Sequence, residues 1–149
     1  MSRHQLQTEI EIDAAPDRVW AILTDFASYP AWNPFIKYVH GIPRPGARLE
    51  VRIQPSGARG MTFRPFVLAA EPGRELRWLG HLLLPGVFDG EHRFEIEPLA
   101  AGNVLFRQSE QFSGLLVPIF RNSLERDTKR GFEELNRALK ARAEARGPG

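Results

Sequence analysis

Residues 116–142 read LVPIFRNSLERDTKRGFEELNRALKAR and have the pattern of one long amphipathic helix. Apolar and small residues recur along this stretch at steps of four, four, three, four and four positions, which is the spacing of one stripe on an α-helix. The stripe consists of Phe120, Leu124, Thr128, Gly131, Leu135 and Leu139. A helix of this length has about five or six turns of stripe to bury. We therefore expect the upstream sequence to supply the surface that covers it.

The upstream sequence predicts strands and two short helices. Residues 5–12 alternate apolar and polar side chains, which is typical of a half-buried strand. Pro16 and Asp17 suit the first turn of a helix expected over residues 16–25, and a second short helix or turn carries Trp32. Turn residues then separate six further strand-like runs, which cover residues 35–39, 47–54, 61–70, 75–83, 88–97 and 103–112.

This order of elements predicts an α+β fold in which a curved antiparallel sheet wraps around the C-terminal helix, in the order β-α-α-β-β-β-β-β-β-α. The length of 149 residues fits a single domain, residues 1–149, with its core over residues 5–142. A strongly curved sheet and one helix do not contact each other along their whole length. We therefore expect an elongated space between them that opens near the two short helices.

Composition and spacing argue against several function classes. The chain has no cysteine, and its four histidines lack the spacing of metal ligands, so neither a metal nor a cofactor is expected. The sequence shows no signal peptide, and its apolar runs fall short of the roughly 20 residues of a membrane span, so we expect a cytoplasmic protein without membrane insertion. The net charge is +2, and the basic residues of the last helix alternate with acidic ones and lack interleaved aromatic residues, which argues against nucleic acid as a partner.

A family resemblance begins at residues 12–34, IDAAPDRVWAILTDFASYPAWNP. This segment resembles the opening of the START-like (SRPBCC) superfamily, which includes polyketide cyclase and dehydrase relatives, lipid-transfer domains and the birch pollen allergen. The segments DGEHRF (89–94) and EQFSGLLVP (110–118) resemble an uncharacterised bacterial branch of that superfamily. The resemblance implies a helix-grip fold with an internal cavity for an apolar small molecule. Because members range from carriers to enzymes, the fold alone does not assign the function.

Three polar residues are predicted to face the cavity near one of its ends. The loop at residues 98–103 sets the register of the last hairpin. Pairing then begins near Glu97 and Val104, and the opposed residues on one face are Ile96 and Phe106, Phe94 and Gln108, and His92 and Glu110. The apolar members identify this face as the inner one, so His92, Gln108 and Glu110 are expected to point inward.

The opposed pair of His92 and Glu110 has two interpretations. A carboxylate beside an imidazole favours the charged imidazolium, so the pair could orient a polar ligand group or transfer a proton. Alternatively, the two side chains are a buried structural pair that satisfies its own hydrogen bonds. Both interpretations are kept, and these two residues are the catalytic candidates.

Aromatic and helix residues complete the expected ligand site. Trp32 and Trp78 offer flat indole surfaces, and both a cavity wall and the core suit them. Gly131 costs about 1 kcal/mol relative to alanine inside a helix, which indicates that a strand or a ligand approaches closely there. The ligand-binding residues expected from the sequence are Trp32, Trp78, His92, Phe94, Phe106, Gln108, Glu110, Phe120, Leu124 and Thr128.

Three functions agree with these observations. The first is binding or transport of a hydrophobic small molecule such as a lipid, a polyketide or an aromatic compound, because such pockets are mostly apolar with few polar anchors. The second is a polyketide cyclase or aromatase that uses His92 and Glu110 for proton transfer next to a carbonyl. The third is a protein-interaction or regulatory module. We expect the first, a non-enzymatic binder that is a monomer or a homodimer.

Overall fold

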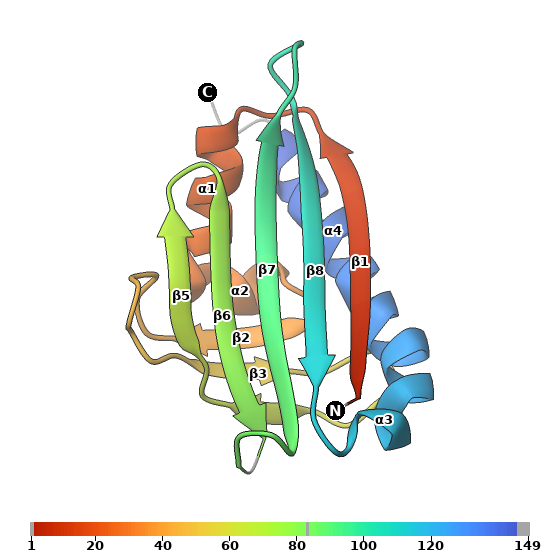
Figure 1. The fold of residues 1–149 in the computed structure, drawn as a ribbon. Coiled ribbons are helices and arrows are strands. Elements are labelled where there is room, and N and C mark those ends of the chain that lie inside the picture. The colour runs from red at the N-terminus through yellow and green to blue at the C-terminus, as the bar shows by residue number, and fades with distance from the viewer. Residues whose placement is uncertain (1, 83, 146–149) are drawn as a thin grey trace.

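The long C-terminal helix lies across a curved antiparallel sheet in the computed structural model, which describes residues 2–82 and 84–145 (Figure 1). The helices and turns are α1 (Pro16–Thr24), the 3₁₀ turn η1 (Phe26–Ser28), α2 (Tyr29–Trp32), α3 (Val117–Ser123), the π-helical turn η2 (Leu124–Thr128) and α4 (Lys129–Glu144). The strands are β1 (Arg3–Ile12), β2 (Ile36–His40), β3 (Glu50–Ile53), β4 (Met61–Phe63), β5 (Phe66–Glu71), β6 (Glu75–Leu82), β7 (Phe88–Pro98) and β8 (Val104–Ser113). This arrangement confirms the predicted α+β helix-grip fold.

The strands form two antiparallel sheets that meet at one edge. The larger sheet has five strands in the order β1-β8-β7-β6-β5, and the smaller has the order β2-β3-β4. The segment before β3 continues onto β5, because the N–H of Leu49 donates to the carbonyl of Pro65 and the N–H of Val67 donates to that of Ala47. Helix α4 packs on β1 and β8 (Figure 1). The inner face of the larger sheet therefore looks toward the helix.

One predicted strand is two strands in the structure. Residues 61–70 were expected as a single run, but β4 ends at Phe63 and β5 begins at Phe66. Pro65 lies between them, and proline has no N–H to donate to a strand ladder. The break lets β4 pair with β3 while β5 pairs with β6. Residues 2–82 and 84–145 thus contain one strand more than the predicted order.

The C-terminal helix is continuous but not regular. The five residues of η2 form a π-helical turn between α3 and α4. A π turn adds a residue to the helical repeat and so rotates the buried face of the helix that follows. Leu135 and Leu139 from the predicted stripe are buried, as are Phe132 and Asn136, which the regular spacing had not placed inside. Before α4, Leu124 of the predicted stripe is buried, whereas Phe120 is 38% exposed.

A close approach occurs at Gly131, but the neighbour is a side chain and not the strand or ligand expected from the sequence. A Cβ atom at this position would lie 2.3 Å from Cδ1 of Phe35, whose ring is buried and packs edge-on against Phe132. The neighbour that needs the space is therefore an aromatic side chain of the residue that precedes β2.

Changing Gly131 to alanine is expected to lower the free energy of unfolding by about 1–2 kcal/mol. Alanine gains about 1 kcal/mol of helix propensity, but overpacking a rigid buried ring costs typically 1–3 kcal/mol and more when the contact is this short. Urea denaturation measures the difference. Ala141→Gly on the exposed side of α4 is the control, and the additional change Phe35→Leu should restore the stability of Gly131→Ala. Stabilisation by Gly131→Ala alone would contradict the packing argument.

Candidate functional site

The register of the larger sheet arranges its inner face in rows that run across β6, β7 and β8. Successive rows contain Gly80, Gly90 and Phe112, then Trp78, His92 and Glu110, then Leu76, Phe94 and Gln108. Glycine has no side chain, so side chains from other positions lie close to the sheet at this level: the Phe63 ring over Gly80 and the Glu110 carboxylate over Gly90. From the next row onward, Trp78 and Phe94 fill the space over the sheet, and both are buried.

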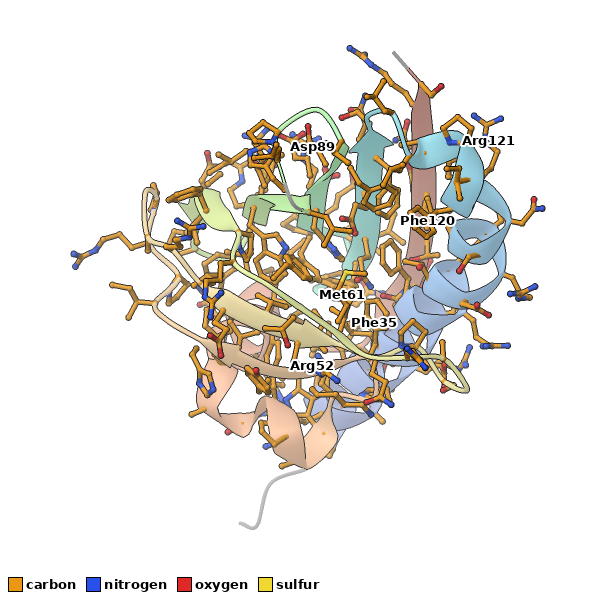
Figure 2. The ribbon with its side chains drawn as sticks, turned by 90° about the horizontal axis from the view of Figure 1, so that it is seen from below. Phe35, Arg52, Met61, Asp89, Phe120 and Arg121 are labelled. Atoms are coloured by element: carbon orange, nitrogen blue, oxygen red, sulfur yellow. The ribbon has the colours of Figure 1, made fainter. Side chains whose placement is uncertain are left out.

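A cavity of about 290 Å³ lies over the glycine row. It is bordered by the loop between β3 and β4, the adjoining ends of β6, β7 and β8, and the α3–η2 segment, and it is open to solvent on one side. Apolar residues supply most of its wall, among them Phe63, Phe88, Phe112 and Leu124. Figure 2 shows Phe35, Met61 and Phe120, three further wall residues, grouped between the helix and the strands.

Glu110 connects the cavity wall to a buried chain of hydrogen bonds. Its Oε1 atom lies 3.0 Å from Nδ1 of His92, and Nε2 of His92 lies 2.8 Å from Oε1 of Gln108. The Gln108 amide donates to Oδ1 of Asn136 at 2.9 Å and to the carbonyl of Phe132 at 3.3 Å. The Asn136 amide in turn donates to the Thr8 hydroxyl at 2.8 Å. The chain thus runs from the cavity, through the core, to α4 and β1.

The hydrogen-bonded groups differ in their access to the cavity. The side chains of His92 and Glu110 are 5% and 14% exposed, and Glu110 is the member of the pair that borders the cavity. A Cβ atom on Gly90 would lie 2.3 Å from Oε2 of Glu110. The carboxylate therefore lies directly over the bare backbone of Gly90. It is a polar group set into an otherwise apolar floor.

Charged residues lie at the rim of the cavity. Nδ1 of His81 is 2.7 Å from Oδ1 of Asp89, whose other oxygen accepts the N–H of Gly86 at 3.0 Å. On the helix side, the hydrogen-bonded guanidinium of Arg126 holds the pKa of the Asp127 carboxyl below its usual value, and the charge of Arg130 acts in the same direction. Over residues 2–82 and 84–145 there is no group of three or more histidine or acidic side chains that could hold a metal ion.

The structure brings some of the predicted site residues to the cavity and leaves the others in the core. Those that border the cavity are Glu110, Phe120, Leu124 and Thr128. Those that lie away from its wall are Trp32, Trp78, His92, Phe94, Phe106 and Gln108. The role of all ten in ligand binding stays a prediction.

Packing explains the placement of the six residues outside the wall. Trp78 and Phe94 contact each other at 5.2 Å between ring centroids, and Phe94 stacks on Phe106 at 6.2 Å, so this part of the inner face is solid core. Trp32 packs against Tyr29 at 5.3 Å, on the side of the short helices. His92 and Gln108 reach the cavity only through Glu110.

The predicted register of the last hairpin is correct on the inner face and off by one residue at its start. His92 lies opposite Glu110 and Ile96 opposite Phe106, as expected. Glu97 pairs with Leu105 instead of Val104, which lies opposite Pro98. The predicted position of the opening is wrong, since the cavity is bordered by the β6–β7 hairpin and α3 and by no described residue of α1 or α2.

Sequence reasoning missed the two glycines that make the cavity. Gly80 and Gly90 both fall inside strand patterns, where an isolated glycine marks a close approach of a ligand or of another part of the chain. They also lie directly opposite each other on β6 and β7. Two such glycines in neighbouring predicted strands are the sequence feature that could have predicted the boundary between the core and the cavity.

Comparison with known proteins gives a family match and a set of similar structures. Residues 3–144 match the family described as "Polyketide cyclase / dehydrase and lipid transport". A search of curated proteins gave no significant sequence match. Within the described residues, no helix is both long and apolar enough to cross a membrane.

Three solved structures illustrate the likeness in fold. The di-domain ARO/CYC BexL from the BE-7585A biosynthetic pathway has a TM-score of 0.79 at 15% identity, and the match covers 97% of this chain but only 51% of that one. This chain therefore spans about half the length of BexL.

Two further neighbours match over nearly their whole length. The Zhui aromatase/cyclase from Streptomyces sp. R1128 has a TM-score of 0.74 at 17% identity, with 96% of this chain and 94% of that one covered. A START superfamily protein from Mycobacterium smegmatis has a TM-score of 0.72 at 23% identity, with 95% and 97% covered. Identities this low show a shared fold. The match over residues 3–144 places the chain in the polyketide cyclase/dehydrase and lipid-transport family.

Proposed function

We propose that this protein binds a hydrophobic small molecule in the cavity between its sheet and its C-terminal helix. The observation that carries the proposal is a space of about 290 Å³ walled mainly by apolar residues, with the Glu110 carboxylate in its floor. Ligand pockets are typically apolar, with a few polar groups that fix the ligand's orientation. The family match and the aromatase/cyclase neighbours support this class of ligand.

The cavity volume narrows the ligand class. A space of about 290 Å³ lies just below the roughly 300–1,000 Å³ of small-molecule sites. It suits a compound of two or three fused rings or one short acyl chain. A phospholipid with two long chains exceeds it.

Leu124→Trp is expected to weaken binding of the neutral fluorescent probe N-phenyl-1-naphthylamine by at least about tenfold, because the larger ring fills part of the cavity. Leu124 is buried in η2 and borders the cavity. Fluorescence titration at pH 7 measures the dissociation constant. Leu115→Trp is the matched control, since Leu115 is 74% exposed, and it should bind the probe as the wild type does. Equal affinities for the two variants, both folded by circular dichroism, would contradict the proposal.

A second candidate function is a cyclase or aromatase reaction. The observation that favours it is the contact of Glu110 with both the cavity and His92, at 3.0 Å from Nδ1. The ionised carboxylate in this position can remove a proton from a carbon next to a ligand carbonyl; Oε2 of Glu110 then carries the proton, while His92 stays hydrogen-bonded to Oε1. Assays with a poly-β-ketone test it: catalysis requires that Glu110→Gln lose turnover while the probe still binds.

A further inference from the structure

We propose that the cavity selects ligands that carry a neutral hydrogen-bond donor, a hydroxyl or a phenol, placed against Oε2 of Glu110. This inference rests on the proposed binding of a hydrophobic small molecule and names the polar group that the ligand carries. It follows from the hydrogen bonds of Gln108, His92 and Glu110, taken in order from the core outward.

The orientation of the Gln108 amide is fixed from the helix side. The carbonyl of Phe132 can only accept a hydrogen bond, so the Gln108 atom 3.3 Å from it is the NH₂ group. The same NH₂ group donates to Oδ1 of Asn136, whose own amide donates to Thr8. Oε1 of Gln108 is therefore the atom that faces His92.

This orientation fixes the tautomer of His92. An amide oxygen only accepts, so Nε2 of His92, at 2.8 Å from Oε1 of Gln108, carries a hydrogen. The other ring nitrogen, Nδ1, faces Oε1 of Glu110 at 3.0 Å. One proton lies between these two atoms, either on Nδ1 beside an ionised carboxylate or on Oε1 beside a neutral ring. With the proton on Oε2, the lone pairs of Nδ1 and Oε1 would face each other.

Oε2 of Glu110 is consequently an acceptor in both states. It is a carboxylate oxygen in the first state and the carbonyl oxygen of the acid in the second. This is the atom that lies over Gly90, and both residues border the cavity. A hydroxyl on the ligand can donate to it. An ether of the same shape cannot, and a ligand carboxylate would be repelled.

Three naphthalene probes of similar shape test the inference: 2-naphthol, 2-methoxynaphthalene and 2-naphthoate, titrated by calorimetry at pH 7. The wild type is expected to bind 2-naphthol about tenfold more tightly than the ether, the size of one hydrogen bond to the wall, and 2-naphthoate most weakly. Binding of 2-naphthol and the ether with equal affinity, or preference for 2-naphthoate, would overturn the inference while the proposed function stands. If none of the three probes binds, the proposed function itself fails.

Two variants of Glu110 test whether this carboxylate, and not another group in the cavity, recognises the ligand hydroxyl. In Glu110→Gln the amide NH₂ donates to Nδ1 of His92 and its oxygen still faces the cavity, so the preference for 2-naphthol persists. In Glu110→Met no acceptor remains, and the preference falls to within about twofold. Glu97→Gln, an exposed carboxylate on β7, is the control and keeps the wild-type preference. If Glu110→Met still prefers 2-naphthol, or if Glu110→Gln loses this preference, Oε2 of Glu110 is not the atom that accepts the ligand hydrogen bond.

Discussion

Replacing Gln108 by leucine is expected to lower the free energy of unfolding by about 3–5 kcal/mol, because a buried polar group left without its partner costs about 1–3 kcal/mol. Leucine has nearly the same size but removes the acceptor of His92 Nε2 and the donor to the carbonyl of Phe132 and to Oδ1 of Asn136. All three groups lie in the core, where water cannot replace Gln108 without opening the packing between β8 and α4. Urea denaturation followed by circular dichroism measures the change.

The same strand supplies a matched control for this variant. Gln111 lies three residues further along β8 and is exposed, so Gln111→Leu makes the same chemical change without burying an unpaired group. We expect it to alter the free energy of unfolding by no more than about 0.5 kcal/mol. Similar stabilities for Gln108→Leu and Gln111→Leu would show that the buried chain does not hold the sheet to the helix.

Half of this hydrogen-bonded chain could be predicted from the sequence. Alternation along β7 and β8, together with the length of the hairpin loop, places His92 opposite Glu110 and turns Gln108 inward. These relations are local to one hairpin. The partners of Gln108 on α4 could not be predicted in the same way, because they depend on how the helix sits on the sheet. The π turn η2 rotates Asn136 inward, and a regular 3.6-residue repeat does not anticipate it.

The position of the cavity could not be predicted from the alternation of residues along the strands. Phe106 and Phe112 lie on the same face of the same strand, and alternation assigns both to the inside. One stacks on Phe94 in the core and the other borders the cavity. An apolar inner face therefore has the same sequence pattern whether it is packed solid or left hollow. The hollow part of the inner face differs from the solid part because Gly80 and Gly90 have no side chains. The effect of these two glycines on packing can be inferred only once they are known to be neighbours in the sheet.

The glycine row leads to the prediction with the largest effect on binding. Gly90→Leu is expected to raise the dissociation constant of N-phenyl-1-naphthylamine by at least about 100-fold, because the new side chain occupies the cavity floor. Gly90 does not have a positive φ, so leucine meets no backbone strain there. Its Cβ would displace the flexible end of Glu110, and a glycine inside a strand contributes little stability of its own. Because the displaced carboxylate leaves Nδ1 of buried His92 without its partner, we expect the free energy of unfolding to fall by about 1–3 kcal/mol.

Glu91→Leu is the control for this variant, since the next residue along β7 places the same side chain on the outer face of the sheet. It should bind the probe with wild-type affinity. If Gly90→Leu is folded and binds the probe as tightly as Glu91→Leu does, the ligand does not lie over the glycine row. Loss of binding in both Gly90→Leu and Leu124→Trp, which enter the cavity from the sheet and from the helix, would locate the ligand between the two layers. A single substitution cannot locate the ligand in this way, because it could weaken binding only by changing the shape of its own wall.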